Sequence, residues 1–182
     1  MNKKPGFSLI ELLVTMAIMV IIVSIAIPRV IPLQKYYIIH ELEKLTVTFK
    51  YLQQKALASN NTQILTFDVK NQSYTFPAPG GKLSTYKLPN GILFGTLKNI
   101  LGPPAKPTHT IQDVITFKKD QKDHDSPVFQ ATFFTNGQIS PGAAYLIDSD
   151  EKVMGAFTCA VSQVSYIRVY VYENNAWKVH AL

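Results

Sequence analysis

The chain of 182 residues is poor in cysteine and has no acidic residue before position 11. Its one cysteine, Cys159, excludes an internal disulfide, so the fold must depend on its apolar core. The apolar neighbours of Cys159 predict a buried strand thiol. Its four histidines form no His-x-x-x-His pair, and no Cys-x-x-Cys is present. Since no nucleophile motif is recognisable either, the sequence does not predict an enzyme.

An almost unbroken apolar run extends from Leu12 to Ile27, and the segment from Phe7 to Ile27 that contains it is long enough to cross a bilayer. Lys3 and Lys4 precede this run. A basic flank of this kind stays in the cytoplasm and directs the following chain outward. Glu11 lies at the start of the run, and a carboxylate at membrane depth should be retained only if it has a partner.

The stretch KKPGFSLIEL, from Lys3 to Leu12, resembles the prepilin signal of type IV pilins and type II secretion pseudopilins. The resemblance implies that prepilin peptidase cuts between Gly6 and Phe7 and that Phe7 is then N-methylated. It also implies that Glu11 meets the positively charged N-terminus of a neighbouring subunit in a filament. Because such a pair depends steeply on distance in a low dielectric, it can set the axial register between subunits.

Two plainer interpretations of this segment stay open. An ordinary secretory signal is cut after its apolar core at a small-residue site, and Ser24-Ile25-Ala26 is the nearest sequence of that kind. An uncut single-pass anchor would let the Glu11 side chain reach the membrane interface. Under the anchor interpretation, the occurrence of Gly6-Phe7 together with Glu11 would be a coincidence.

Proline and apolar spacing organise the next part of the chain. Pro28 and Pro32 are predicted to interrupt the N-terminal helix. Beyond them, one apolar stripe predicts a helix that packs on its own domain. The stripe consists of Ile38, Leu42, Leu45, Phe49, Leu52 and Ala56. The predicted organisation is a leader at 1–6, a transmembrane and assembly helix at 7–32, its amphipathic continuation at 33–61 and a β-rich head at 62–182.

After residue 61 the pattern changes to short apolar runs separated by turn residues. The predicted strands are 63–67, 73–76, 86–88, 92–94, 114–118, 128–135, 143–147, 153–161, 164–172 and 177–180. Strands 86–88 and 92–94 are expected to pair or to flank a tight turn at Pro89-Asn90-Gly91. The predicted fold class is therefore α+β, a long N-terminal helix packed on an antiparallel sheet or a two-sheet head.

The run VFQATFFTNG at 128–137 resembles the strand and turn of GspH/FimT-type minor subunits, although their usual Gly-Arg is replaced here by Ile167-Arg168. The resemblance implies a structural subunit, a minor pseudopilin or minor pilin, of a type II secretion system or type IV pilus. Its implied partners are prepilin peptidase, other pilin or pseudopilin subunits, an inner-membrane assembly platform and the lipid bilayer. It places the chain in the inner membrane as a single-pass protein with a cytoplasmic N-terminus and a periplasmic head.

Two binding functions are further hypotheses. Asp148, Asp150 and Glu151 offer oxygen ligands to calcium, which some pseudopilins hold in a loop, although such a run also suits a solvated turn. The acidic run at 120–125 is a second candidate of the same kind. No other cofactor is predicted.

The net charge of +6 gives the second of these hypotheses, a FimT-like subunit that binds DNA. The candidate contacts are Lys98, Lys106, Arg168 and Lys178. A modest excess of lysine also serves solubility, and the sequence does not show that these residues form one patch.

Overall fold

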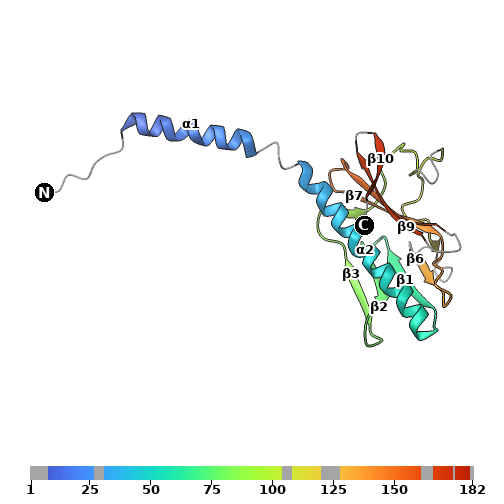
Figure 1. The fold of residues 1–182 in the computed structure, drawn as a ribbon. Coiled ribbons are helices and arrows are strands. Elements are labelled where there is room, and N and C mark those ends of the chain that lie inside the picture. The colour runs from blue at the N-terminus through green and yellow to red at the C-terminus, as the bar shows by residue number, and fades with distance from the viewer. Residues whose placement is uncertain are drawn as a thin grey trace. The chain divides into compact units, whose positions relative to one another are not determined.

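The computed structural model describes residues 8–26, 31–103, 108–119, 128–160, 166–173 and 175–180. The chain divides into two compact units, Met1–Tyr36 and Tyr37–Leu182. Helix α1, Leu9–Ala26, belongs to the first unit, and helix α2, Ile31–Ser59, continues into the second (Figure 1).

Helix α1 is apolar around its whole circumference. Glu11 is its one charged residue, and its large apolar side chains from Leu9 to Val23 are exposed. A helix of this composition is normally covered by a protein core or by lipid, because no face of it is suited to water. No helix in the described part of the chain combines the length and the apolar character that a membrane crossing requires.

Pro32 lies in the first turn of α2. A proline is tolerated there because the N–H that it lacks would have no helical partner. Helix α1 ends at Ala26 and α2 begins at Ile31, so Pro32 lies at the beginning of the second helix. Pro28 lies outside the described residues, and the predicted interruption at the two prolines stays a prediction. Helix α2 ends at Ser59, close to the predicted end of the amphipathic segment at residue 61, and Asn60 after it has a left-handed backbone with φ 49°.

The apolar stripe of α2 packs against its own domain, as the spacing predicts. All six stripe residues are at most 2% exposed and belong to one core cluster with residues of both sheets. The ring of Phe49 is the centre of this cluster. It lies 4.9 Å from the ring of Phe133 in one sheet and 4.5 Å from that of Phe157 in the other, centroid to centroid.

The described strands form two five-stranded antiparallel sheets, which confirms the prediction of a two-sheet head. The first sheet has the order β3-β2-β1-β6-β5, made of Leu83–Lys87, Ser73–Pro77, Gln63–Asp68, Val128–Phe133 and Lys118–Lys119. The second has the order β10-β9-β8-β7-β4, made of Ala176–His180, Tyr166–Glu173, Met154–Ala160, Gly142–Asp148 and Ile92–Phe94. Figure 1 shows α2 crossing in front of the first sheet, with the strands of the second sheet beside it.

Of the two expectations for strands 86–88 and 92–94, the tight turn is confirmed, since the Ile92 N–H donates to the Pro89 carbonyl at 3.2 Å, and the pairing is wrong. Strand β3 pairs with β2, and strand β4 pairs with β7 in the other sheet. The turn between them, in which Gly91 has φ 91°, moves the chain from one sheet to the other and closes no hairpin. The predicted strand 114–118 is also largely absent, since only Lys118–Lys119 forms β5 and Ile115 makes an isolated bridge to Ala144.

Close packing of α2 on the second sheet depends on a glycine in β8. A Cβ atom built on Gly155 would lie 2.5 Å from Leu42 Cδ1 and 2.6 Å from Ile38 Cγ2. Both side chains are fully buried, so neither can move away without opening the core. Glycine at 155 therefore allows the helix to lie directly on this strand.

Candidate functional site

The start of α1 is closed by a reciprocal pair of hydrogen bonds between Ser8 and Glu11. The Ser8 N–H donates to Glu11 Oε2 at 2.9 Å, and the Glu11 N–H donates to Ser8 Oγ at 3.3 Å. The first helical bond follows directly, from the Leu12 N–H to the Ser8 carbonyl at 3.3 Å. This is the capping box that the spacing Ser-x-x-Glu favours, and it satisfies two of the backbone N–H groups that open a helix.

The capping box fixes where the one charge of α1 lies. The Glu11 carboxylate is held at the N-terminal end of the helix, where the helix dipole favours a negative charge. Its other oxygen, Oε1, makes no hydrogen bond to any described residue, so it is available to a cation from outside the helix. Gly6 and Phe7, the predicted cleavage and methylation positions, lie outside the described residues.

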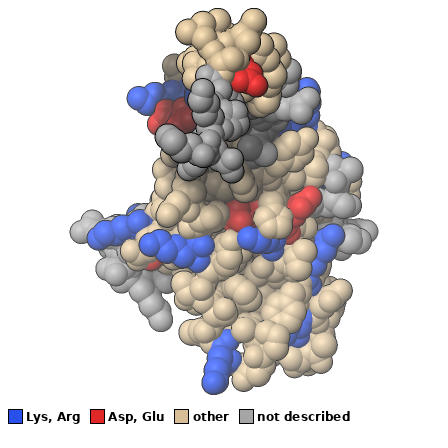
Figure 2. Space-filling view, turned by 90° about the vertical axis from the view of Figure 1, so that its left-hand side faces the viewer, with Lys and Arg blue, Asp and Glu red and all other residues tan. Residues whose placement is uncertain are grey.

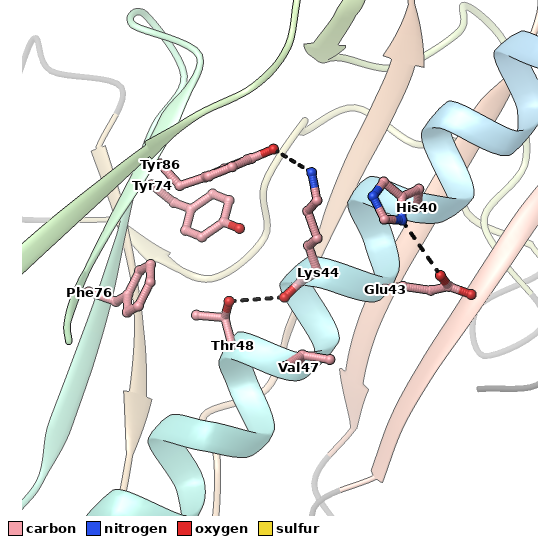
Figure 3. Close-up of a pocket in the computed structure, with 8 residues that line it drawn as sticks. All are labelled: His40, Glu43, Lys44, Val47, Thr48, Tyr74, Phe76 and Tyr86. Carbon is pink, nitrogen blue, oxygen red and sulfur yellow. Dashed lines mark hydrogen bonds and ion pairs between the residues drawn. The ribbon is translucent and has the colours of Figure 1, made fainter. Parts of the chain in front are cut away.

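A groove of about 420 Å³ lies on the head between α2 and the β2–β3 edge of the first sheet (Figure 3). Its walls are mostly apolar, with aromatic rings from the two strands on one side and the helix on the other. The lining residues are His40, Glu43, Lys44, Val47, Thr48, Tyr74, Phe76 and Tyr86. Burial raises the pKa of Tyr74 to about 12, so this hydroxyl stays neutral.

A charged triad links α2 to β3 at this groove. Lys44 Nζ donates to Glu41 Oε1 at 2.8 Å and to the Tyr86 hydroxyl at 2.9 Å, and that hydroxyl donates to Glu41 Oε2 at 2.8 Å. The hydrogen bond that Lys44 donates to Glu41 is the largest cause of the raised pKa of Lys44, whereas burial is the largest cause of the raised pKa of Tyr86. Glu41 is only 4% exposed, so the triad compensates a buried carboxylate.

The sequence reasoning did not identify this triad. The spacing of Glu41 and Lys44, three residues apart on a helix, is a signal for an ion pair. The spacing gives no indication that the Glu41 carboxylate is buried. Its burial depends on Tyr86, which lies on a strand 42 residues after Lys44. A second link joins α2 to the last strand, where His180 Nε2 lies 3.2 Å from Glu43 Oε1.

The predicted calcium ligands are not brought together. Asp148 is 2% exposed, and its Oδ1 accepts the N–H groups of Lys152 at 2.8 Å and Val153 at 2.7 Å, which shapes the β7–β8 turn. Asp150 points to the Lys152 ammonium at 3.4 Å, and Glu151 is exposed. Among the described residues no three His, Cys, Asp or Glu side chains are grouped as metal ligands. Calcium binding stays a prediction, and the run at 120–125 lies outside the described residues.

The predicted DNA contacts are dispersed. Lys178 on β10 is directly opposite Val171 on β9, so it shares a face with Val171. Arg168 is three positions from Val171 and therefore leaves the other face of the sheet. Lys98 lies in the loop after β4, between Leu97, whose N–H contacts Met154 Sδ on β8, and Leu101, whose carbonyl accepts a hydrogen bond from Trp177 on β10. Lys106 is outside the described residues. In Figure 2 the basic side chains of the visible face also stand apart, with uncharged surface between most of them.

Cys159 lies on β8 and is buried, as its apolar neighbours predict. Burial raises the pKa of its thiol to about 11. Since the thiolate is the nucleophilic form, this cysteine is unreactive at neutral pH.

Comparison with known proteins identifies the N-terminus. The family model of the prokaryotic N-terminal methylation motif matches residues 1–27. Neither curated proteins nor solved structures gave a match. The protein therefore combines an α+β head of two antiparallel sheets with a methylation motif of the type IV pilin type. The resemblance of the N-terminal segment to type IV pilins and pseudopilins is thereby confirmed, and the match does not extend to the head.

Proposed function

We propose that the protein is a structural subunit, a minor pseudopilin or minor pilin, of a type II secretion system or type IV pilus. Prepilin peptidase cuts the precursor after Gly6 and the new N-terminal residue, Phe7, is methylated. Residues 7–32 anchor the chain in the inner membrane, with the N-terminus cytoplasmic and the head periplasmic, until the subunit enters a filament through an assembly platform. The proposal extends to the GspH/FimT type on the resemblance of residues 128–137.

One observation carries the proposal: α1 is apolar on every side, bears a single carboxylate at its first turn and lies within the methylation motif. Such a helix needs an apolar environment over its whole surface. Lipid supplies it before assembly, and the equivalent helices of other subunits supply it afterwards. The same surface therefore serves both states, and subunits of this design need no catalytic site.

Glu11 gives the assembled state its register. A bundle of apolar helices can slide along its axis with little change in buried area, because apolar contacts are non-directional. A carboxylate that must meet the cationic N-terminus of a neighbour removes that freedom, since a charge left without a partner in a low dielectric is strongly unfavourable. The position of Glu11 at the helix start supports a contact at the end nearest the processed terminus.

The test is to express the Glu11→Ala variant in the native host and to follow cleavage and filament incorporation separately. We expect normal removal of residues 1–6 and at least about a tenfold loss of the subunit from sheared filaments, because the variant loses the interchain charge pair in addition to the Ser8 N–H bond to Glu11 Oε2. The matched control is Thr15→Ala, which removes a hydroxyl that donates to the Leu12 carbonyl one turn further along the same helix. Incorporation of Glu11→Ala at the wild-type level would refute the register role.

A further inference from the structure

We infer that the outer edge of β3, together with the groove beside it, is a docking surface for an extended segment of another protein in which apolar and acidic residues alternate. The segment pairs with β3 as an added strand. Strand β3 ends the first sheet, and among the described strands only β2 pairs with it. The inference goes beyond the proposed function, because it concerns the head and uses no residue of the N-terminal segment.

The backbone of β3 offers hydrogen bonds on its outer side. On the inner side, the Leu88 N–H donates to the Gln72 carbonyl at 2.8 Å. Bonded positions recur at every second residue of an antiparallel ladder, so the alternate residues turn their backbone groups away from β2. These are Leu83, Thr85 and Lys87, and no described residue bonds to their N–H or C=O groups. A row of unpaired backbone groups is a template for a further strand.

The face of the sheet at the groove is apolar. Its strand side consists of the rings of Tyr74, Phe76 and Tyr86 (Figure 3). Val47 of α2 lies across from them and is 67% exposed. The Tyr86 hydroxyl is already engaged in the triad with α2, so this wall offers mainly carbon to a partner. Every second side chain of a strand added to β3 points to this face, which therefore favours apolar side chains there.

The charge around β3 is positive. Lys82 and Lys87, just before β3 and at its end, are exposed and form no ion pair with a described residue. The chain from 69 to 112 contains no Asp or Glu. Glu43, which lines the groove, lies 3.2 Å from His180 Nε2 and would repel an acid placed there. The acidic side chains of the added strand therefore belong on the face opposite the groove, which carries Lys87.

The same lysines argue against a second copy of this chain as the occupant. Antiparallel pairing of two β3 strands centred on Thr85 would bring Lys82 of one copy close to Lys87 of the other at each end. Like charges across a strand pair are destabilising, and lysine on an edge strand commonly prevents such self-pairing. An acidic strand turns this repulsion into attraction.

The test uses the full-length chain in nonionic detergent micelles and a fluorescent synthetic peptide, Thr-Val-Glu-Val-Glu-Val-Thr. Binding is measured by fluorescence anisotropy, with protein-free micelles as the blank. One version of the peptide is N-methylated at its glutamates, whose N–H groups point to β3 when the valines face the groove. The matched control is N-methylated at its valines, whose N–H groups then point to solvent.

Three variants of the chain complement the peptides. Thr85→Pro removes one outward N–H and keeps the bonds to β2, and an edge strand tolerates proline at such a position. Lys82→Glu combined with Lys87→Glu inverts the charge beside β3. Lys118→Glu combined with Lys119→Glu is the matched control, because it makes the same charge change on β5, at the opposite edge of the same sheet.

We expect saturable binding of the acidic peptide. Its affinity should fall about tenfold when the glutamates are N-methylated, in Thr85→Pro and in the variant with both β3 lysines inverted, since each loses hydrogen bonds or charge contacts. The valine-methylated peptide and the β5 variant should keep the wild-type affinity. A peptide with lysine in place of glutamate should bind the variant with inverted β3 lysines better than it binds the wild type, which a misfolded head would not do.

Equal binding of the two methylated peptides would overturn the inference, because no backbone pairing would then be involved. Absence of saturable binding of the acidic peptide would also overturn it. An equal loss in the β5 variant would do the same, since net charge alone would then attract the peptide. Self-association of the wild-type chain that Thr85→Pro abolishes would make a second copy the occupant. None of these results depends on cleavage after Gly6, so failure of the inference is distinguishable from failure of the proposed function.

Discussion

Replacing Phe49 with alanine should destabilise the head more than any exposed change on the same helix. Phe49 is 0% exposed and its ring contacts four others, those of Phe67, Phe117, Phe133 and Phe157, at centroid distances of 4.5 to 6.3 Å. The partners come from both sheets, so Phe49 joins the helix to two layers at once. Truncating a buried phenylalanine typically costs about 3–5 kcal/mol.

We expect the upper part of this range, about 4–5 kcal/mol, because neither sheet can close the cavity without losing contact with the other. Edge and tilted ring contacts add about 0.5–1.5 kcal/mol per pair beyond buried area, although these values are not additive. A loss of this size is a large part of the about 5–15 kcal/mol that stabilises a typical domain. Phe49→Leu, which leaves a smaller cavity, should cost about 1–2 kcal/mol and keeps the comparison measurable if the alanine variant does not fold.

The assay is urea unfolding of the full chain in detergent micelles, followed by the fluorescence of Trp177, the one tryptophan of the chain. Val47→Ala is the control, because Val47 lies on the same helix and is 67% exposed. Its effect should stay within about 0.5 kcal/mol. A cost below about 1 kcal/mol for Phe49→Ala would refute the central position of this ring.

Four further predictions concern the head, and the same unfolding assay measures the first two and the last. Gly155→Ala should cost about 1–3 kcal/mol, because the new methyl group would overlap buried side chains of α2; a neutral effect would contradict the close approach. Tyr86→Phe should cost about 1–3 kcal/mol, because it removes the hydroxyl that donates to Oε2 of the buried Glu41 carboxylate and leaves only the Lys44 bond to Oε1, and a stabilised variant would show that the triad is not required. Cys159 should not react with a thiol reagent at pH 8 until the chain unfolds. Burial raises the pKa of Cys159 from 9.0 to about 11 and that of Tyr74 from 10.0 to about 12, so both groups are held neutral in the folded head. The free energy of unfolding should therefore be full below pH 9 and fall as the pH rises toward 12. A free energy of unfolding that does not depend on pH over this interval would refute the burial argument.

Local patterns in the sequence predicted much of the fold. The helical spacing from Ile38 to Ala56 identified the buried face of α2, because one period of 3.6 residues decides which side chains meet the core. Apolar runs between turn residues located most of the strands in the described part of the chain. The Ser-x-x-Glu spacing at Ser8 and Glu11 was also a readable signal for a helix start.

Long-range partners were not predictable from those patterns. The turn at Gly91 could have closed a hairpin or changed sheets, and only the packing of the whole head decides that β3 and β4 separate. Pro32 could have broken a helix or begun one, because the same missing N–H is unfavourable inside a helix and harmless in its first turn. Burial of Glu41 depends on Tyr86 from a distant strand, and the separation of Arg168 from Lys178 depends on strand register.

The most direct test of the proposed function is intact mass spectrometry of the protein purified from membranes of its own host. The methylation motif at residues 1–27 predicts a mass that lacks Met1 to Gly6 and carries one additional methyl group on Phe7. That mass would establish processing as a prepilin and leave the choice of filament to the assembly experiments. A full-length mass would contradict the proposal and would indicate an uncut anchor, whose function would have to be sought in the head.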